Sequence, residues 1–134
     1  MMYDLLSDTI CRIKQAHLKN HPEVICTRTK FICSVLDVLW KEGLIGGYSY
    51  HPDDYKLVTV HLTYFENLSP KLLFLKRYSK PGKRVYVSTK ELKSLLNRGV
   101  SNYGFYILST NQGIMTSSKA LQLSIGGELI CFAG

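Results

Sequence analysis

The sequence predicts an α+β protein of two small lobes. Apolar residues recur at helical spacing in residues 5–16 and 31–39, whereas residues 56–64 alternate as a strand with one covered face does. The charge balance also changes along the chain: residues 1–70 hold 7 basic and 8 acidic side chains, and residues 71–98 hold 9 and 1. We therefore expect a joint at Phe65 to Pro70, between an N-terminal α/β lobe over residues 1–66 and a C-terminal β-rich lobe over residues 71–134.

The N-terminal lobe is predicted to contain a helix, a strand, a second helix and a hairpin. Asp4 is a suitable N-cap, and a proline two residues after Asn20 favours an extended segment there. Thr27 or Thr29 can begin the second helix, and Gly43 is placed to end it. In chain order the predicted elements are a helix from Asp4 to about residue 18, a strand over residues 23–27, a helix ending before Gly43, and strands over residues 45–50 and 56–64.

The C-terminal lobe is predicted to be mostly strand with a short helix. Ser88 and Glu91 have the spacing of a capping box, and Gly99 is expected to stop the helix that they begin. The other predicted elements are strands over residues 72–78 and 84–87 joined as a hairpin by a Pro-Gly turn, a strand over residues 105–108, a polar loop over residues 109–120, and a strand over residues 128–133. On local chemistry alone, the polar loop is better described as a β-turn followed by a short helix with Thr116 or Ser117 as its N-cap.

The composition points to a polyanionic partner. The formal net charge is +7 and the pI about 9.3, so nucleic acid is the first expectation and an anionic membrane surface the second. No apolar run approaches the ~20 residues that span a bilayer, and the N-terminus lacks the pattern of a signal or transit peptide. We expect neither a membrane role nor import from another compartment.

The candidates for metal binding and catalysis are weak. Four cysteines without a Cys-x-x-Cys pair predict reduced, mostly buried thiols. His17 and His21 could share a helix face as zinc ligands, although two surface histidines are the commoner outcome. An enzyme would need Ser109 or Thr110 as nucleophile and His61 as base, and His61 has no partner visible in the sequence. We expect no metal, cofactor, catalytic residue or small-molecule substrate.

The positive segment and the polar loop together have the character of an RNA-binding surface. Cations neutralise phosphates, hydroxyls and amides bond sugars and base edges, and glycines let a backbone approach its partner closely. The C-terminal candidates are Lys76, Arg77, Lys80, Lys83, Arg84, Ser109, Thr110, Asn111, Gly113, Thr116, Lys119, Gly126, Gly127 and Glu128. In the N-terminal lobe the candidates are Arg12, Lys14 and Lys30, for which a solvated helix face is the alternative.

The order Ser-Thr-x-x-Gly-Ile-Met-Thr over residues 109–116, followed by Lys119-Ala120 and Gly126-Gly127-Glu128, resembles the C-terminal signature of the eighth small-subunit ribosomal protein family. Residues 4–18, 27–45 and 77–92 resemble the family too. The resemblance implies a non-enzymatic structural component of the small subunit, which binds the central domain of small-subunit rRNA, supports its assembly and touches neighbouring ribosomal proteins. Asn111 and Gln112 depart from the family's usual hydroxyl and cation, which implies weaker binding or compensation by a neighbour.

The function has one serious alternative, and the compartment has two candidates. A free-standing RNA-binding regulator would use the same surface on an mRNA. For a ribosomal protein, +7 is modest, and four cysteines with nine tyrosines suggest drift in an organelle genome. We expect an organelle-encoded protein of the mitochondrial matrix, with the bacterial cytoplasm as the alternative.

Overall fold

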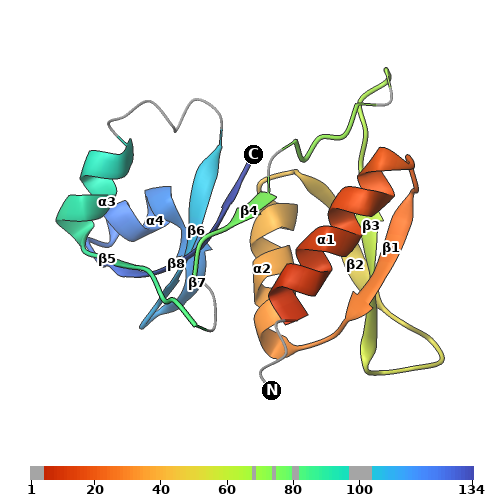
Figure 1. Cartoon of the computed structure of the whole chain (residues 1–134), viewed down its shortest axis with the longest axis horizontal. Helices are drawn as coiled ribbons and strands as arrows, with labels where there is room; N and C mark the ends of the chain where they lie inside the picture. The colour runs from red at the N-terminus through yellow and green to blue at the C-terminus, as the bar shows by residue number, and fades with distance from the viewer. Residues whose placement is uncertain (1–4, 68, 74, 80–81, 97–103) are drawn as a thin grey trace. The chain divides into compact units, whose positions relative to one another are not determined.

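The computed structural model describes residues 5–67, 69–73, 75–79, 82–96 and 104–134. The chain divides into two compact units, residues 1–73 and 74–134, which are described separately (Figure 1). The predicted α+β class is confirmed, because helices and antiparallel sheets occur in both units. The predicted cap at Asp4, the residues Lys80 and Pro81 of the predicted Pro-Gly turn, and the helix stop at Gly99 lie outside the described residues.

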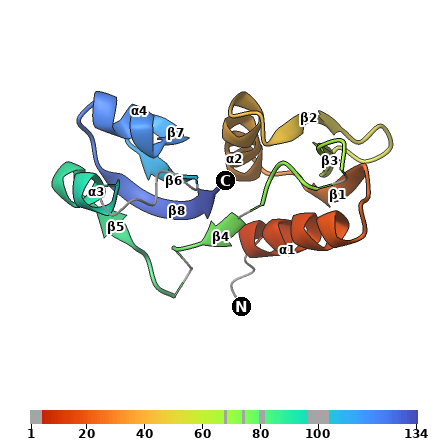
Figure 2. The ribbon, with the colours of Figure 1, turned by 90° about the horizontal axis from the view of Figure 1, so that it is seen from above.

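The N-terminal unit is a three-stranded antiparallel sheet with two helices on one of its faces (Figure 2). The strand order is β1-β3-β2, and α1 contacts β1 while α2 contacts β2. The elements are α1 (Leu5–Leu18), β1 (Glu23–Thr27), α2 (Lys30–Lys41), β2 (Ile45–Tyr50) and β3 (Leu57–Leu62). They follow the predicted order, and β3 is shorter at both ends than the strand expected over residues 56–64.

Local chemistry sets the ends of these helices. Thr29 has extended backbone, and its hydroxyl accepts a hydrogen bond from the Ile32 amide at 3.1 Å, so Thr29 rather than Thr27 caps α2. Gly43 follows α2 with φ +77°, as a C-terminal glycine requires. The chain after α1 turns at Asn20, whose φ is 53°.

Alternating side chains of β3 meet the apolar stripe of α2 to form the core of this unit. Val58 and Val60 are fully buried, and Ile32, Leu36 and Leu39 are 1% exposed. A fully buried aliphatic side chain stabilises a fold by about 1.5–3 kcal/mol. The period of 2 in β3 and of 3.6 in α2 therefore fix which faces meet.

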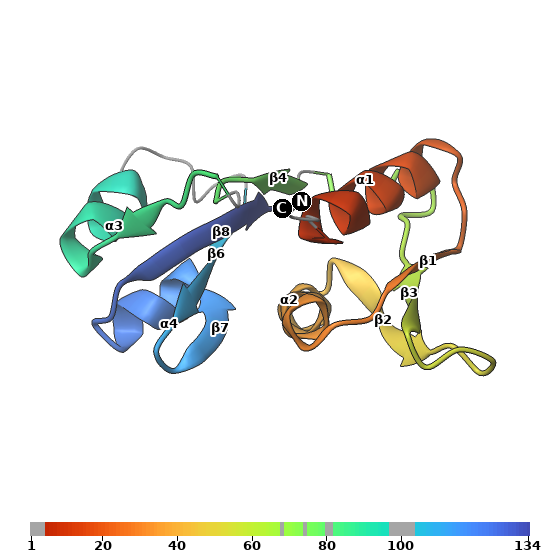
Figure 3. The same cartoon turned by 60° about the horizontal axis from the view of Figure 1, so that its bottom comes forward.

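The C-terminal unit contains an antiparallel sheet in which β8 pairs with β4, β5 and β6 (Figure 3). The path of the sheet is β4-β8-β6-β7, and β5 pairs with β8 as well. The elements are β4 (Leu75–Arg77), β5 (Tyr86–Val87), α3 (Thr89–Leu96), β6 (Phe105–Thr110), β7 (Gly113–Thr116), α4 (Ser117–Gln122) and β8 (Gly127–Ala133). Both helices contribute to an apolar cluster on one face, through Leu92 of α3 and Ala120 of α4.

The predicted hairpin of residues 72–78 and 84–87 is wrong. Leu75 pairs with Ala133, and Tyr86 pairs with Glu128, so β4 and β5 both lie along β8 instead of pairing with each other. Between β4 and β5, the Ser79 hydroxyl accepts a hydrogen bond from the Val85 amide at 2.9 Å and donates one to the Val85 carbonyl at 3.2 Å. Ser79 and Val85 are therefore tied to each other beside the edge of β8 that carries β4 and β5.

The segment from residue 109 to 120 is ordered structure rather than an open loop. Ser109 and Thr110 finish β6, Asn111 and Gln112 make the turn, and Gly113 begins β7. The Thr116 hydroxyl then accepts from the Lys119 amide at 3.3 Å and caps α4. The turn and short helix favoured by local chemistry are confirmed, and α4 is a second helix in the lobe expected to hold one.

The capping residue of α3 is also confirmed. The Ser88 hydroxyl accepts from the Glu91 amide at 3.2 Å and donates to the Glu91 carboxylate at the same distance. Leu92, four residues into the helix, is fully buried. Across the described ranges, no helix is both long enough and apolar enough to span a lipid bilayer.

Candidate nucleic-acid interface

Four side chains form a row across the C-terminal sheet on the face away from its helices. Tyr86 of β5 is opposite Glu128 of β8, Glu128 is opposite Ser109 of β6, and Ser109 is opposite Ile114 of β7. Directly opposed residues of antiparallel strands share a face. We call Tyr86, Glu128, Ser109 and Ile114 the polar row.

The neighbours of the polar row along each strand show which face it occupies. Val87, Leu108, Met115 and Leu129 belong to the apolar cluster that includes α3 and α4. Because successive side chains of a strand point to opposite faces, the polar row points away from those helices. Tyr86 is 66% exposed, and the other three are half-buried.

The polar row carries a neutralised acid. Arg84 Nη1 lies 2.9 Å from Glu128 Oε1, and the Arg84 side chain is 48% exposed whereas that of Glu128 is 16% exposed. The guanidinium offsets the repulsion that a lone carboxylate would exert on a phosphate. Glu128 can then accept hydrogen bonds from sugar hydroxyls or base amino groups.

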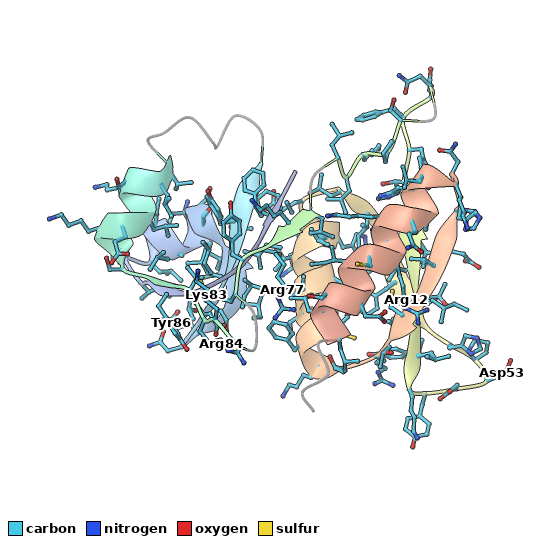
Figure 4. All side chains as sticks on the ribbon, in the orientation of Figure 1. Arg12, Asp53, Arg77, Lys83, Arg84 and Tyr86 are labelled. Atoms are coloured by element: carbon cyan, nitrogen blue, oxygen red, sulfur yellow. The ribbon has the colours of Figure 1, made fainter. Side chains whose placement is uncertain are left out.

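Other candidate cations lie along the edge formed by β4 and β5. Lys83, Arg84 and Tyr86 lie close together, and Arg77 is further along the same edge (Figure 4). Arg77 Nε donates to the Ser79 carbonyl, and Lys76 Nζ lies 5.4 Å from the centre of the Tyr78 ring. Lys83 is exposed, and Lys80 is outside the described residues.

The charge distribution places the whole net charge in the C-terminal unit. Residues 74–134 hold 9 basic and 2 acidic side chains, a net +7, and residues 1–73 hold 8 of each. A polyanion is therefore attracted to the unit that carries the polar row.

The threonine hydroxyls of the β6–β7 hairpin form hydrogen bonds within the chain. Thr110 Oγ1 donates to the Gly113 carbonyl at 2.9 Å and accepts from the Gln112 amide at 3.1 Å, which closes the β6–β7 turn. Thr116 caps α4, while Asn111 and Lys119 are exposed. The structure thus places Ser109, Asn111 and Lys119 where they can meet a ligand, and Thr110 and Thr116 where they first shape the hairpin.

The three candidate glycines have structural roles of two kinds. A Cβ on Gly126 would collide with the Val87 carbonyl oxygen, and one on Gly127 would collide with the Ser109 carbonyl oxygen. Their close approach is therefore to this chain's own backbone, although the sequence suggested a partner. Gly113 instead has φ +110° in an open position, as the turn requires.

The N-terminal candidates are spread over two helices. Arg12 on α1 forms an ion pair with Asp8, 2.9 Å away, and also lies 3.4 Å from the Ile25 carbonyl oxygen (Figure 4). Lys14 is exposed on the same helix, and Lys30 is exposed at the start of α2.

Of the two histidines expected at the surface, His21 is exposed and His17 is partly buried. The helix ends at Leu18, so the two histidines do not share a helix face. His17 packs edge-on against Tyr64, with ring centres 5.7 Å apart, and its Nε2 is buried without a hydrogen bond. Burial lowers the pKa of His17. Among the described residues, no group of three or more His, Cys, Asp or Glu side chains is arranged to hold a metal.

The cysteines and His61 differ in part from expectation. Cys26 and Cys131 are buried, and burial raises the pKa of Cys26 to about 11, so it is a protonated thiol at neutral pH. Cys33 is partly buried and Cys11 is exposed, so Cys11 departs from the prediction of mostly buried thiols and Cys33 departs from it in part. His61 has partners after all: Nε2 lies 3.2 Å from Ser49 Oγ, and Nδ1 lies 3.7 Å from Glu23 Oε2.

Sequence reasoning missed Tyr86 and Ile114 as members of the site. Tyr86 stands two residues after Arg84, so a strand places both on one side, and that spacing was a usable signal. Ile114 carried no signal of its own, because its place in the row depends on the register of β6 with β7.

The sequence is similar to known proteins along almost its whole length. A family model described as "Ribosomal protein S8" matches residues 4–133. The chain is 41% identical to "Small ribosomal subunit protein uS8" of Caulobacter sp. over 132 residues, covering 97% of this chain and 96% of the relative. It is 36% identical to "Small ribosomal subunit protein uS8c" of Phaeodactylum tricornutum over 134 residues, covering 98% of each. A relative from Dictyoglomus turgidum is 38% identical over 129 residues, covering 96% of this chain and 95% of that protein.

Proposed function

Because this chain belongs to the ribosomal protein S8 family, we propose that the polar row and the cations beside it form its surface for small-subunit rRNA. The protein is a structural component of the small ribosomal subunit and not an enzyme. Its partners are small-subunit rRNA and other ribosomal proteins. The observation that carries the proposal is the juxtaposition of Tyr86, Glu128 and Ser109 on one sheet face, beside the charged edge of β4 and β5.

The chemistry of this surface suits a double-helical stretch of RNA. The minor groove of A-form RNA is wide and shallow and displays 2′-hydroxyls and base edges, so a nearly flat sheet face can reach them. Ser109 and Glu128 would bond those groups from the centre of the row. Lys83, Arg77 and Lys119 would neutralise the flanking phosphates.

We assign the RNA target to the central domain of small-subunit rRNA, where binding would support assembly of the subunit. This assignment follows from the family resemblance of the signature in residues 109–128. Lys14 and Lys30 of the N-terminal unit would add phosphate contacts, and Arg12 would do so alongside its ion pair with Asp8. Lys76 and Lys80 belong to the same proposed set of cations.

A binding titration tests the surface directly. The probe is a transcript of the central-domain rRNA, and the variant is Ser109→Ala, with Ser94→Ala at an exposed position of α3 as the matched control. Loss of one hydrogen bond at a desolvated contact costs about 1 kcal/mol, so we expect Ser109→Ala to bind about fivefold more weakly and Ser94→Ala to bind like wild type. Equal binding by all three proteins would show that the polar row does not contact this RNA.

For the compartment, we propose a ribosome of the mitochondrial matrix. The support is compositional: nine tyrosines, four cysteines and a modest +7 net charge suit a protein that has drifted in an organelle genome. Fractionation of the source cells tests it, because the protein must sediment with small subunits from purified mitochondria. Recovery with ribosomes from any other compartment would contradict the proposal.

A further inference from the structure

The N-terminal unit contains a cavity, and Lys30 is the one residue of its lining to which the preceding proposal gives a role. Its volume is about 580 Å³, within the roughly 300–1,000 Å³ typical of small-ligand sites. It lies where the start of α2 approaches the end of β2 and the loop that leads to β3. We call it the Tyr55 cavity, and the side chains that give it its chemistry are Arg28, Lys30, Asp37, Tyr50, Tyr55 and Lys56.

The charge of the Tyr55 cavity differs from that of the unit around it. The unit as a whole is neutral, but three cations and one carboxylate line the cavity. That carboxylate, Asp37, accepts a hydrogen bond from the Tyr48 hydroxyl at 2.8 Å. The cavity therefore presents an excess of positive charge to an anionic ligand.

Two exposed aromatic rings complete the lining. Tyr55 is 74% exposed and Tyr50 is 58% exposed, so both tyrosines are open to solvent. Tyr50 is directly opposite the fully buried Val58, so its ring is on the side of the sheet that α2 covers. A flat ring with an accessible face is a surface on which a nucleobase can stack.

Arg28 holds the two tyrosine segments in place. Its guanidinium carbon is 3.9 Å from the centre of the Tyr50 ring, and its Nη1 donates to the Tyr55 carbonyl at 3.2 Å. The Arg28 amide also donates to the Lys56 carbonyl at 2.8 Å. These contacts fix the cavity before a ligand arrives, which reduces the entropy lost on binding.

We infer that the Tyr55 cavity binds one unpaired nucleotide of an RNA strand, with its base stacked on Tyr55 and its phosphate paired with Lys30 and Lys56. Cations with exposed aromatics are the combination that binds single-stranded nucleic acid, because an unpaired base has a free face for stacking and a base stacked inside a duplex does not. The inference rests on the proposed function, because it gives an rRNA-binding protein a second contact of a different kind.

Fluorescence anisotropy of the full-length chain with a labelled, unstructured RNA decamer tests the inference. Stacking of one base predicts that Tyr55→Ala binds the decamer at least about fivefold more weakly, and that Tyr55→Phe, which keeps the ring, binds like wild type. Lys56→Ala should also weaken binding. Lys41→Ala, a change of equal charge at an exposed position outside the cavity, should have a smaller effect.

Several results would overturn the inference. The inference is wrong if wild type and Tyr55→Ala bind the decamer equally and thermal unfolding shows that both are folded. The cavity would then bind another ligand, such as an acidic protein. Adenosine monophosphate binding as tightly as the decamer would also overturn the inference, because the site would then serve a free nucleotide. The Ser109→Ala titration with central-domain rRNA is read separately, so failure of the polar row and failure of the Tyr55 cavity are distinguishable.

Discussion

Gly127 and Gly113 lack a side chain for different physical reasons, and their substitutions should differ accordingly. A Cβ on Gly127 would strike the Ser109 carbonyl oxygen at the end of the β6–β8 pairing, whereas one on Gly113 would meet nothing within 4 Å. Gly127→Ala must push two paired strands apart, so we expect a loss of more than about 2 kcal/mol in the free energy of unfolding. Gly113→Ala should lower the free energy of unfolding by only about 1 kcal/mol, the cost of placing an alanine at positive φ.

Urea denaturation of the two glycine variants measures this difference. The pair is matched, since each replaces one glycine of the same sheet with alanine. A Gly127→Ala variant as stable as Gly113→Ala would mean that the backbone at Gly127 is not as closely packed as the structure describes.

His17 makes the stability of the N-terminal unit depend on pH. Burial lowers the pKa of His17 below its ordinary value of 6.5, so the unfolded chain takes up this proton more readily than the folded chain does. Neutral His17 makes its full contribution to the free energy of unfolding above about pH 6.5, and this contribution is lost as the pH falls below that value. Wild type should therefore lose more stability between pH 8 and pH 5.5 than His17→Phe, which keeps a ring against Tyr64.

His21→Phe is the control for the pH series, because His21 is exposed. It should retain the pH dependence of wild type. The free energy of unfolding is measured by urea denaturation at the two pH values. If it fell equally for wild type and His17→Phe, His17 would be excluded as the source of the pH dependence.

At the scale of elements, the sequence was sufficient wherever an element is decided by residues close to it. The caps at Thr29 and Ser88 are hydrogen bonds to amides three residues away, so the spacing revealed Ser88 and narrowed the other cap to Thr27 or Thr29. The alternation in β3 likewise determined which of its side chains are buried. Turn and cap chemistry even favoured the correct structure for residues 109–120.

The sequence was insufficient wherever a partner strand lies far away in the chain. Leu75 and Tyr86 both pair with β8, more than forty residues later, and a Pro-Gly turn between them suggested the local hairpin instead. The same limit applies to the polar row. Ser109 and Glu128 were recognised by their chemistry, but their position side by side, with Tyr86 next to Glu128, follows only from strand register.

At the scale of the whole molecule, a neutral unit is joined to one that carries a net +7. This asymmetry means that the salt dependence of rRNA binding should arise mainly from residues 74–134. Each phosphate contact adds roughly 0.7–0.9 to the slope of log K against log salt concentration. Lys83→Ala, which removes an exposed cation beside the polar row, should lower the slope by about that amount.

Lys93→Ala provides the matched change, because Lys93 is exposed on α3, whose Leu92 packs into the opposite face of the sheet. It should leave the slope nearly unchanged, since a distant cation is screened beyond the Debye length of about 8 Å at physiological salt. If both variants lowered the slope of log K against log salt concentration equally, binding would depend on the total charge of the unit. Cations at the edge of β4 and β5 would then contribute no more than other cations of the unit. A difference between them would place the RNA on the face that carries Tyr86, Glu128 and Ser109.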